Sequence, residues 1–293
     1  MPELPEVEHV VRALRRVVMG RTIVAAEVKL PKLTSPDSPS KFVRQVRGST
    51  IIGVSRRGKF ILIELERTAA SPQSGRKRSR KFDGVKNFVL VVHLRMTGKF
   101  LYLSPDDDLP KHAHAIFYLH NDKRLVFRDQ RKFGVMKLVS ISRLKSTKGI
   151  SELAPEPFED GFNLAYLQAT LSRSQRTLKT LLLDQTKVLG LGNIYAAEAL
   201  FRARISPFAI AARLSAKRSA RLHTAIQDVL KFAVAHIRGS ISLAEGFSYG
   251  AAFETFWQVY DREGEPCGRC GTRIRRITHG GRSTYWCPRC QRR

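Results

Sequence analysis

The sequence of 293 residues predicts an α+β fold that is divided into several domains. Three observations indicate this: helical apolar spacing over 5–19, short β-rich runs over 22–139, and four cysteines confined to the C-terminal end. Hydrophobic residues make up 43% of the chain, which at this length is enough to form sizeable cores. We expect three domains, at 1–150, 151–240 and 241–293.

The first predicted element is an amphipathic helix over residues 5–19. Its apolar residues lie three and four positions apart: Val7, Val10, Val11, Leu14, Val17 and Val18. Pro5 suits the first turn of such a helix, and Gly20 suits its end. The N-terminal domain is therefore expected to begin with a helix.

The region 22–139 predicts a β-sandwich or barrel. Its β-rich runs are separated by Gly, Pro, Asp and Asn and read VSRRGKFILIELE, NFVLVVHLRM, HAIFYL, RLVFR and GVMKLVS. Within it, residues 71–86 form a polar, basic insertion with little to bury, which predicts a mobile loop. This insertion either strengthens binding to any polyanion through its charge or is a solvated linker without function.

A linker and a helical domain follow the β-rich region. Residues 150–162 (ISELAPEPFEDGF) are rich in Pro and acid, which is typical of an interdomain linker. Further along, Ser215 is placed to cap a helix that ends at Gly239. The apolar face of that helix consists of Leu222, Ile226, Val229, Leu230, Ala233 and Ile237.

The charge of the chain indicates a polyanionic partner. Lys and Arg number 52 and Asp and Glu 25, so the formal net charge is +27. Compact proteins carry such charge chiefly when they bind nucleic acid, because Lys and Arg contacts to phosphates release counterions. No segment has about 18 uncharged apolar residues, and the acidic start MPELPEVEHV does not resemble a secretory signal. We expect a cytosolic or nucleoid location and no membrane partner.

The cysteines predict a structural metal site. Cys267, Cys270, Cys287 and Cys290 form the pattern C-x2-C-x16-C-x2-C, in which two knuckles close a tetrahedral Zn²⁺ site. Four thiolates leave no open position for water, so one Zn²⁺ is expected to hold the C-terminal segment folded rather than to take part in chemistry.

The N-terminus offers a nucleophile. Pro2 follows the initiator Met, so removal of Met1 would expose a secondary amine. An α-amino group loses its proton more easily than a lysine, and attack on a sugar carbon would give an iminium. Glu3 and Glu6 lie nearby and could donate and accept protons, although acids in a first helical turn also serve the helix dipole.

Several motifs together resemble bacterial formamidopyrimidine-DNA glycosylase. They are MPELPEVE, RRGKF around Lys59, HLRMTG around Met96, RKFG around Phe133, LGNIYAAEALF from Leu191, and the four-cysteine finger. The resemblance covers essentially the whole chain in the family's order. The related endonuclease VIII branch usually opens PEGPE, so Leu4 favours the branch that acts on oxidised purines.

The resemblance implies a fold and an activity. The fold is an N-terminal helix with a β-sandwich, a helical domain of the helix-two-turn-helix type, and a C-terminal zinc finger. The activity is that of a bifunctional DNA glycosylase and AP lyase for oxidised purines such as 8-oxoguanine and formamidopyrimidines. The implied partner is damaged double-stranded DNA, bound by a monomer at the bacterial nucleoid.

The resemblance also implies catalytic roles. Pro2 attacks C1′ of the flipped nucleotide, and Glu3 is the acid that helps to open the sugar. Glu6 stays a candidate catalytic acid or base on the residues alone, because it lies near that amine in the sequence. Lys59 matches a lysine that contacts phosphate near the reacting sugar, although from the residues alone it could be an ordinary surface lysine. Arg282 matches an arginine that assists the second elimination.

Further residues match DNA contacts. Met96, Arg131 and Phe133 match a wedge that fills the vacated stack, although Phe133 could instead fill a core. His112, Lys179 and Asn193 match contacts to the DNA backbone. Asn193 follows a glycine-flanked turn at a predicted helix N-terminus, so it could mark a phosphate site, cap the helix, or do both.

Some segments depart from the family pattern. Arg95 stands where the family more often has glycine, and Lys132 replaces an arginine. The segment 240–252 corresponds to the loop that covers the flipped base, and the insertion at 71–86 is not typical of the family. Two alternatives stay open: an endonuclease VIII-like enzyme for oxidised pyrimidines, and a non-catalytic zinc-finger DNA-binding protein.

Overall fold

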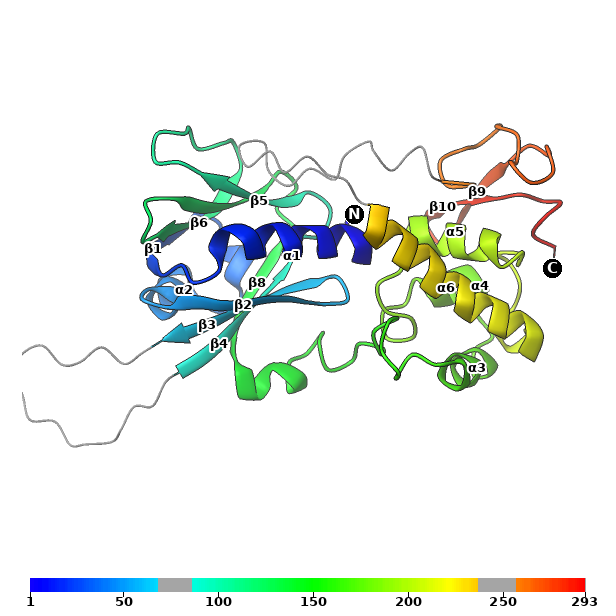
Figure 1. The fold of residues 1–293 in the computed structure, drawn as a ribbon, viewed down its shortest axis with the longest axis horizontal. Helices are drawn as coiled ribbons and strands as arrows, with labels where there is room; N and C mark the ends of the chain where they lie inside the picture. The colour runs from blue at the N-terminus through cyan, green and yellow to red at the C-terminus, as the bar shows by residue number, and fades with distance from the viewer. Residues whose placement is uncertain (68–85, 237–256, 293) are drawn as a thin grey trace, which may run out of the picture. The chain divides into compact units, whose positions relative to one another are not determined.

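The computed structural model describes residues 1–67, 86–236 and 257–292 (Figure 1). The expected loop at 240–252 and the basic insertion, apart from Lys86, lie outside these residues. The chain divides into two compact units, which are described separately below. Among the described residues, unit 1 holds 1–2 and 7–151, and unit 2 holds 3–6 and the residues from 152 onward.

Unit 1 contains two four-stranded antiparallel sheets (Figure 1). One sheet has the order β2-β3-β4-β8, with β2 Thr50–Arg57, β3 Phe60–Arg67, β4 Lys86–His93 and β8 Val135–Ser140. The other has the order β1-β6-β7-β5, with β1 Ile23–Val28, β6 Ala113–Leu119, β7 Arg124–Asp129 and β5 Gly98–Leu103. The predicted β-rich region is thereby confirmed.

Helix α1 (Leu4–Val18) forms almost where the spacing predicts it and buries its apolar face with both sheets. The core that it shares with them includes Val10 and Leu14 from the helix, Ile63 and Val92 from one sheet, and Phe117 and Phe127 from the other. This core explains the helix, because apolar residues three and four apart share one side of it.

Three short helical elements of unit 1 were not predicted. Two of them, η1 (Pro31–Thr34) and α2 (Pro39–Val46), interrupt the β-rich region, and η2 (Ile141–Ser146) follows it. Helix α2 has a local cause, since the Ser38 hydroxyl accepts the backbone N–H of Lys41 at 3.3 Å and Pro39 occupies the first turn. Its eight residues are too few for a clear periodic signal in the sequence.

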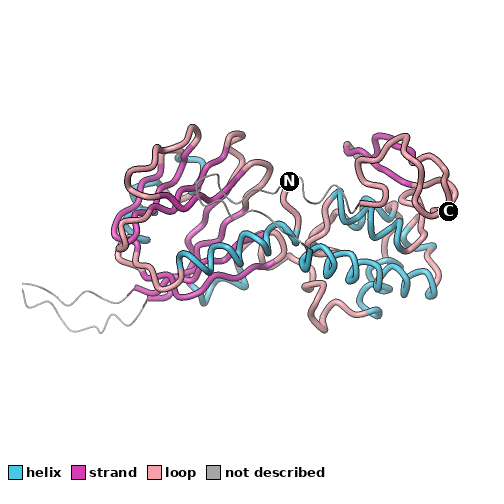
Figure 2. Tube along the Cα trace, turned by 45° about the horizontal axis from the view of Figure 1, so that its top comes forward, coloured by secondary structure: helices cyan, strands magenta, loops and turns pink. Residues whose placement is uncertain are grey.

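Unit 2 is mainly helical, as the colouring of Figure 2 shows. Its elements are α3 Leu164–Ser172, α4 Leu178–Leu182, α5 Asn193–Arg202, η3 Ala211–Arg213, α6 Ala216–His236, β9 Arg275–His279 and β10 Arg282–Trp286. Helix α6 begins directly after Ser215, as expected, while Gly239 lies outside the described residues. These elements confirm the predicted fold class.

The predicted linker is partly packed. Ala154 and Phe162 are buried, and the carbonyl of Phe162 accepts a hydrogen bond from His223 Nε2 at 2.9 Å. Much of the segment 152–162 therefore packs as part of unit 2 rather than forming a free linker. No described helix has the length and apolar character that a membrane span requires.

Candidate functional site

The carboxylate of Glu3 lies at the N-terminus of α5. It accepts backbone N–H groups from Gly192 at 2.5 Å, Ile194 at 2.9 Å and Tyr195 at 3.3 Å. The first N–H groups of a helix have no partner within it, and the helix dipole places partial positive charge there. Glu3 satisfies these groups, so the helix fixes its carboxylate in place.

This contact corrects one part of the sequence interpretation. From the residues alone, Asn193 could mark a phosphate site at the N-terminus of α5, cap the helix, or do both, but the carboxylate of Glu3 occupies this end of the helix. The Asn193 side chain does not cap the helix either; its Nδ2 donates to the carbonyl of Ser283 at 3.0 Å. Asn193 stays a predicted DNA contact, without the helix-terminus argument.

Two glycines of the LGLGN motif make room for the N-terminus. A Cβ atom on Gly192 would lie 2.4 Å from Cδ of Glu3, and one on Gly190 would lie 2.5 Å from Cδ1 of Leu4. Gly190 also has a φ of +87°, which L side chains rarely adopt. Both glycines are therefore required by the close approach of Glu3 and Leu4.

Glu6 holds the peptide bond that joins Pro2 to Glu3. One carboxyl oxygen of Glu6 accepts the Glu3 N–H at 2.7 Å, and the other accepts the Tyr195 hydroxyl at 2.6 Å. In a capping box, the side chain of the third helical residue accepts the backbone N–H of the N-cap residue, and the bond from Glu3 N–H to Glu6 is of this kind. Burial, reinforced by the neighbouring charge of Glu3, raises the pKa of Glu6 to about 7.

The raised pKa of Glu6 predicts a pH-dependent stability. The folded protein binds this proton more readily than the unfolded chain, so the contribution is full below pH 4.5 and is lost as pH rises towards 7. Relative to Glu6→Gln, the wild type should lose about 3 kcal/mol of unfolding free energy across that interval. Thermal unfolding of both proteins from pH 4 to pH 8 measures the difference.

Glu8→Gln is the matched control, because the pKa of Glu8 is lowered in the folded protein whereas that of Glu6 is raised. Burial of Glu8 acts to raise its pKa, but hydrogen bonds and charges from Arg56 and Arg12 outweigh burial and lower it. The contribution of Glu8 is therefore lost as pH falls. Parallel pH profiles for wild type and Glu6→Gln would contradict the assignment.

A second group of predicted residues surrounds Ser283 on β10. Lys179 Nζ donates to the Ser283 carbonyl at 2.5 Å and to Thr284 Oγ1 at 2.6 Å. The same Ser283 carbonyl also accepts the hydrogen bond from Asn193 Nδ2. The Lys179 side chain is buried, and burial together with the charge of Arg282 lowers its pKa to about 8. Lys179 and Asn193 thus anchor β10, while Arg282 at its start is exposed.

The predicted wedge residues are exposed on two loops of unit 1. Met96, between β4 and β5, is 42% exposed, and Phe133, between β7 and β8, is 44% exposed. The alternative that Phe133 fills a core is therefore wrong. The guanidinium of Arg131 lies 4.9 Å from the centre of the Phe133 ring, a cation–π distance.

Asp129 joins these two loops, and the sequence analysis did not identify it. Its buried carboxylate accepts the Thr97 hydroxyl from one loop and the backbone N–H groups of Arg131, at 3.3 Å, and Gly134, at 2.6 Å, from the other. The Asp129 N–H also donates to the carbonyl of His112 at 3.0 Å. One carboxylate therefore sets the positions of the loops that carry Met96, Arg131 and Phe133.

The remaining predicted catalytic residues are divided between the two units. Pro2 and Lys59 belong to unit 1, whereas Glu3, Glu6 and Arg282 belong to unit 2. Lys59 follows Gly58 in the turn between β2 and β3 and is only 4% exposed. It is therefore not the ordinary surface lysine that the residues alone allowed.

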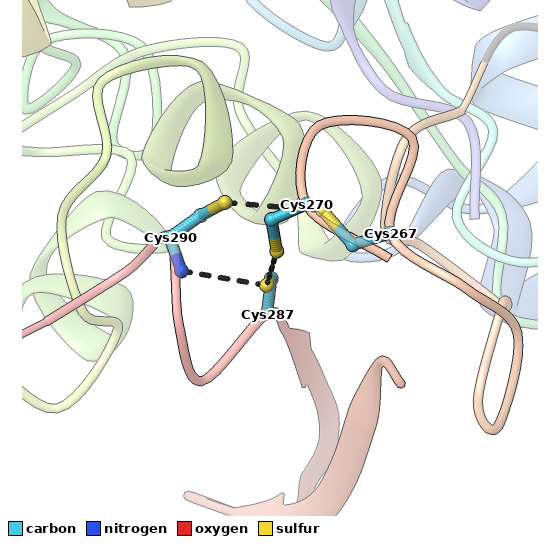
Figure 3. Close-up of side chains that lie close together, drawn as sticks. All are labelled: Cys267, Cys270, Cys287 and Cys290. Atoms are coloured by element: carbon cyan, nitrogen blue, oxygen red, sulfur yellow. Dashed lines mark hydrogen bonds between the residues drawn. The ribbon is translucent and has the colours of Figure 1, made fainter. Parts of the chain in front are cut away.

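The four cysteines converge as a metal site requires (Figure 3). Their sulfur atoms all lie within 4.8 Å of one another, with Cys270 and Cys287 at 3.5 Å and Cys267 and Cys290 at 3.9 Å. Tetrahedral Zn²⁺ with Zn–S bonds near 2.3 Å separates its sulfurs by about 3.8 Å. The donor set thus fits one Zn²⁺, which would fix the hairpin of β9 and β10.

Protein purified without chelator should contain one Zn²⁺ per chain. Cys287→Ser should lose most of this zinc and unfold mainly the C-terminal hairpin, since that hairpin buries few large apolar side chains of its own. Metal analysis and proteolysis of both proteins measure the effect. A wild-type protein without stoichiometric zinc would remove the claim.

Comparisons with known proteins cover nearly all of the chain. Residues 1–136 match the model of the formamidopyrimidine-DNA glycosylase N-terminal domain, and 153–245 match the H2TH domain of the same enzyme. Residues 264–293 match the zinc finger found in FPG and IleRS. The matched regions thus follow the order of one family along the chain.

Individual relatives agree with these models. Formamidopyrimidine-DNA glycosylase of Pelotomaculum thermopropionicum is 42% identical over 100% of this chain and 99% of its own length. A Lactococcus lactis Fpg variant in complex with Fapy-dG-containing DNA is 32% identical, with a TM-score of 0.87 over 100% of both chains. Wild-type L. lactis Fpg in complex with DNA containing an oxidised pyrimidine has a TM-score of 0.85, also at 32% identity and 100% coverage of both chains. The chain therefore belongs to the formamidopyrimidine-DNA glycosylase family.

Proposed function

We propose that this protein is a bifunctional DNA glycosylase and AP lyase that removes oxidised purines, such as 8-oxoguanine and formamidopyrimidines, from damaged double-stranded DNA. The observation that carries the proposal is the placement of the PELPE start. Glu3, which follows Pro2, is held by the N–H groups of Gly192, Ile194 and Tyr195 at the start of α5, and Glu6 holds the peptide bond between Pro2 and Glu3. These contacts support a fixed position for the terminal amine.

The proposed first step forms a covalent intermediate. After removal of Met1, the Pro2 nitrogen bonds to C1′ of the damaged nucleotide while the bond from C1′ to the base breaks. The base leaves as an anion and takes a proton from water, which becomes hydroxide. The proton released by the amine passes to Glu3. Glu3 then gives it to the ring oxygen O4′ as the C1′–O4′ bond breaks, leaving an iminium between Pro2 and C1′.

The iminium makes strand cleavage possible. It acidifies the C2′ hydrogens, so loss of one of them expels the 3′ phosphate, and a second elimination expels the 5′ phosphate. Lys59 contacts phosphate beside the sugar, and Arg282 assists the second elimination. Met96, Arg131 and Phe133 occupy the space left by the flipped base, and His112 and Asn193 contact the backbone. Lys179, expected from the resemblance to contact the backbone too, is buried and acts instead by holding β10.

The chain is proposed to act as a monomer in the bacterial cytoplasm, at the nucleoid. Its net charge of +27 supports DNA as the partner. A second candidate function is removal of oxidised pyrimidines, because L. lactis Fpg forms a complex with DNA of that kind. Leu4, in PELPE rather than PEGPE, favours purines.

Excision from matched duplexes tests the proposal. Duplexes of one sequence, each carrying 8-oxoguanine, a formamidopyrimidine or an oxidised pyrimidine, are incubated with excess protein, and single-turnover rates are measured. We expect both purine lesions to be excised faster, with phosphate on both ends of the gap. Faster pyrimidine excision would establish the endonuclease VIII-like alternative, and binding without cleavage would establish the non-catalytic one.

A further inference from the structure

A cavity of about 350 Å³ on unit 1 has no role in the proposed reaction. We call it the η1–β8 pocket, because it lies between these two elements; the start of β3, the end of β4, Arg95 and the segment 147–150 complete its lining. These segments are distant in sequence, so the hollow is a product of the fold.

The rim of the η1–β8 pocket is strongly cationic. Four basic residues line it: Lys32, Arg95, Lys137 and Lys148. No Asp or Glu of the described chain is part of the lining, and none of the four cations forms an ion pair with another described residue. Four cations around one hollow repel each other, and a bound anion would offset that repulsion.

The rest of the lining carries no charge. It includes Phe60, Val91 and Val135, and the edge of the Phe60 ring meets the His93 ring at a centroid distance of 4.7 Å. His93 Nδ1 accepts the N–H of Arg95 at 3.0 Å, and burial with the nearby cations lowers the pKa of His93 to about 3. A neutral imidazole adds no charge, so the attraction for an anion comes from the rim alone.

The pocket is continuous with the loops that carry the proposed wedge. Lys32 Nζ lies 5.9 Å from the centre of the Phe133 ring, and Arg95 directly precedes Met96. A duplex that receives both wedge residues therefore brings its backbone close to this rim. A sugar–phosphate unit suits the lining, since its phosphate meets cations and its sugar meets Phe60 and the two valines.

We propose that the η1–β8 pocket binds one phosphodiester group of the DNA duplex, through Lys32, Arg95, Lys137 and Lys148, as a contact separate from those at the reacting nucleotide. This inference rests on the proposed function, because the wedge loops place the duplex there. The pocket adds affinity and fixes the register of the duplex without reading its bases.

Charge-matched double variants test the pocket. Lys137→Gln/Lys148→Gln removes two rim cations, and Lys29→Gln/Lys145→Gln removes two exposed lysines outside the lining, neither of which forms an ion pair with a described residue. For a lesion duplex, losing one phosphate contact should lower the slope of log Kd against log salt by about 0.9 in the first variant. Kd at low salt should rise about 5-fold in the first variant and less than about 2-fold in the control. Equal effects in both variants would overturn the proposal.

Duplexes with single uncharged phosphate analogues show which phosphate the pocket contacts. Duplexes in which single phosphates are replaced by methylphosphonates are bound to wild type and to Lys137→Gln/Lys148→Gln. At one or two positions the wild type should lose affinity while the variant loses none, because its contact is already missing. If the affinity losses from the methylphosphonate and from the double variant were additive at every position, the two lysines would act only through long-range electrostatic attraction. That result would overturn the pocket as a binding site.

The two proposals can fail separately. Borohydride trapping at saturating protein reports the proposed reaction, and the Lys137→Gln/Lys148→Gln variant should trap as completely as wild type. No trapping by wild type would reject the proposed function. Normal trapping together with the same methylphosphonate losses in the variant as in wild type would reject only the pocket. Thermal unfolding midpoints establish that the variants are folded.

Discussion

Blocking the amine of Pro2 should abolish both covalent trapping and strand cleavage. With wild type, borohydride should reduce the iminium during turnover and leave protein joined to lesion-bearing DNA at Pro2. Retention of Met1 or an N-terminal tag turns the amine into an amide, whose nitrogen lone pair is delocalised and not nucleophilic. Cleavage should fall at least about 10³-fold, because the amine forms the bond on which later steps depend.

Two further proteins sharpen this test. Pro2→Thr keeps a free amine but loses the proline ring and the secondary nitrogen, so it should trap poorly. The same tag placed at the C-terminus should leave trapping intact, which separates the amine from any effect of the tag. Efficient trapping through an internal lysine with Pro2 blocked would overturn the assignment.

Glu3→Gln should impair base excision more than cleavage of a preformed abasic site. Glu3 is proposed to accept the proton of Pro2 and return it to O4′, and an amide can do neither. Acid–base assistance of this kind contributes about 10² to 10⁴-fold. Single-turnover rates on a lesion duplex and on an abasic duplex measure the difference, since the abasic sugar has no base to lose.

Gly192→Ala separates the position of Glu3 from its chemistry. The new Cβ would lie 2.4 Å from Cδ of Glu3, so the carboxylate must leave the α5 N-terminus although it is still present. Excision should fall in this variant, and the helix should lose about 1–3 kcal/mol through its unpaired N–H groups. Full excision by Gly192→Ala would show that the contact with α5 does not position Glu3 for the reaction.

The sequence by itself determined the elements whose signals are local. The three-and-four spacing predicted α1, short alternating runs predicted the strands, and the cysteine spacing predicted a site whose sulfurs lie within 4.8 Å. The excess of Lys and Arg indicated nucleic acid before any site was visible. These properties depend on neighbouring residues or on total charge, so the sequence carries them directly.

Only the tertiary structure decided which distant groups meet. Glu3 is separated by 189 positions from Gly192, and nothing in either motif indicates that its carboxylate caps α5. The phosphate site that the residues allowed at this helix end is therefore already filled by Glu3. Asp129 was missed for the same reason, since its partners lie on two loops that are separate in sequence.

Burial also depended on the tertiary structure. From the residues alone Lys59 could be a surface lysine and Phe133 could fill a core, but Lys59 is buried and Phe133 is exposed on a loop. Lys179, expected as a DNA contact from the resemblance, is buried as well. Lys179 can be buried because the carbonyl of Ser283 and the hydroxyl of Thr284, about a hundred positions further along the chain, accept hydrogen bonds from its amine. The side-chain type sets the energetic cost of burial, and only the folded chain supplies the partners that offset this cost.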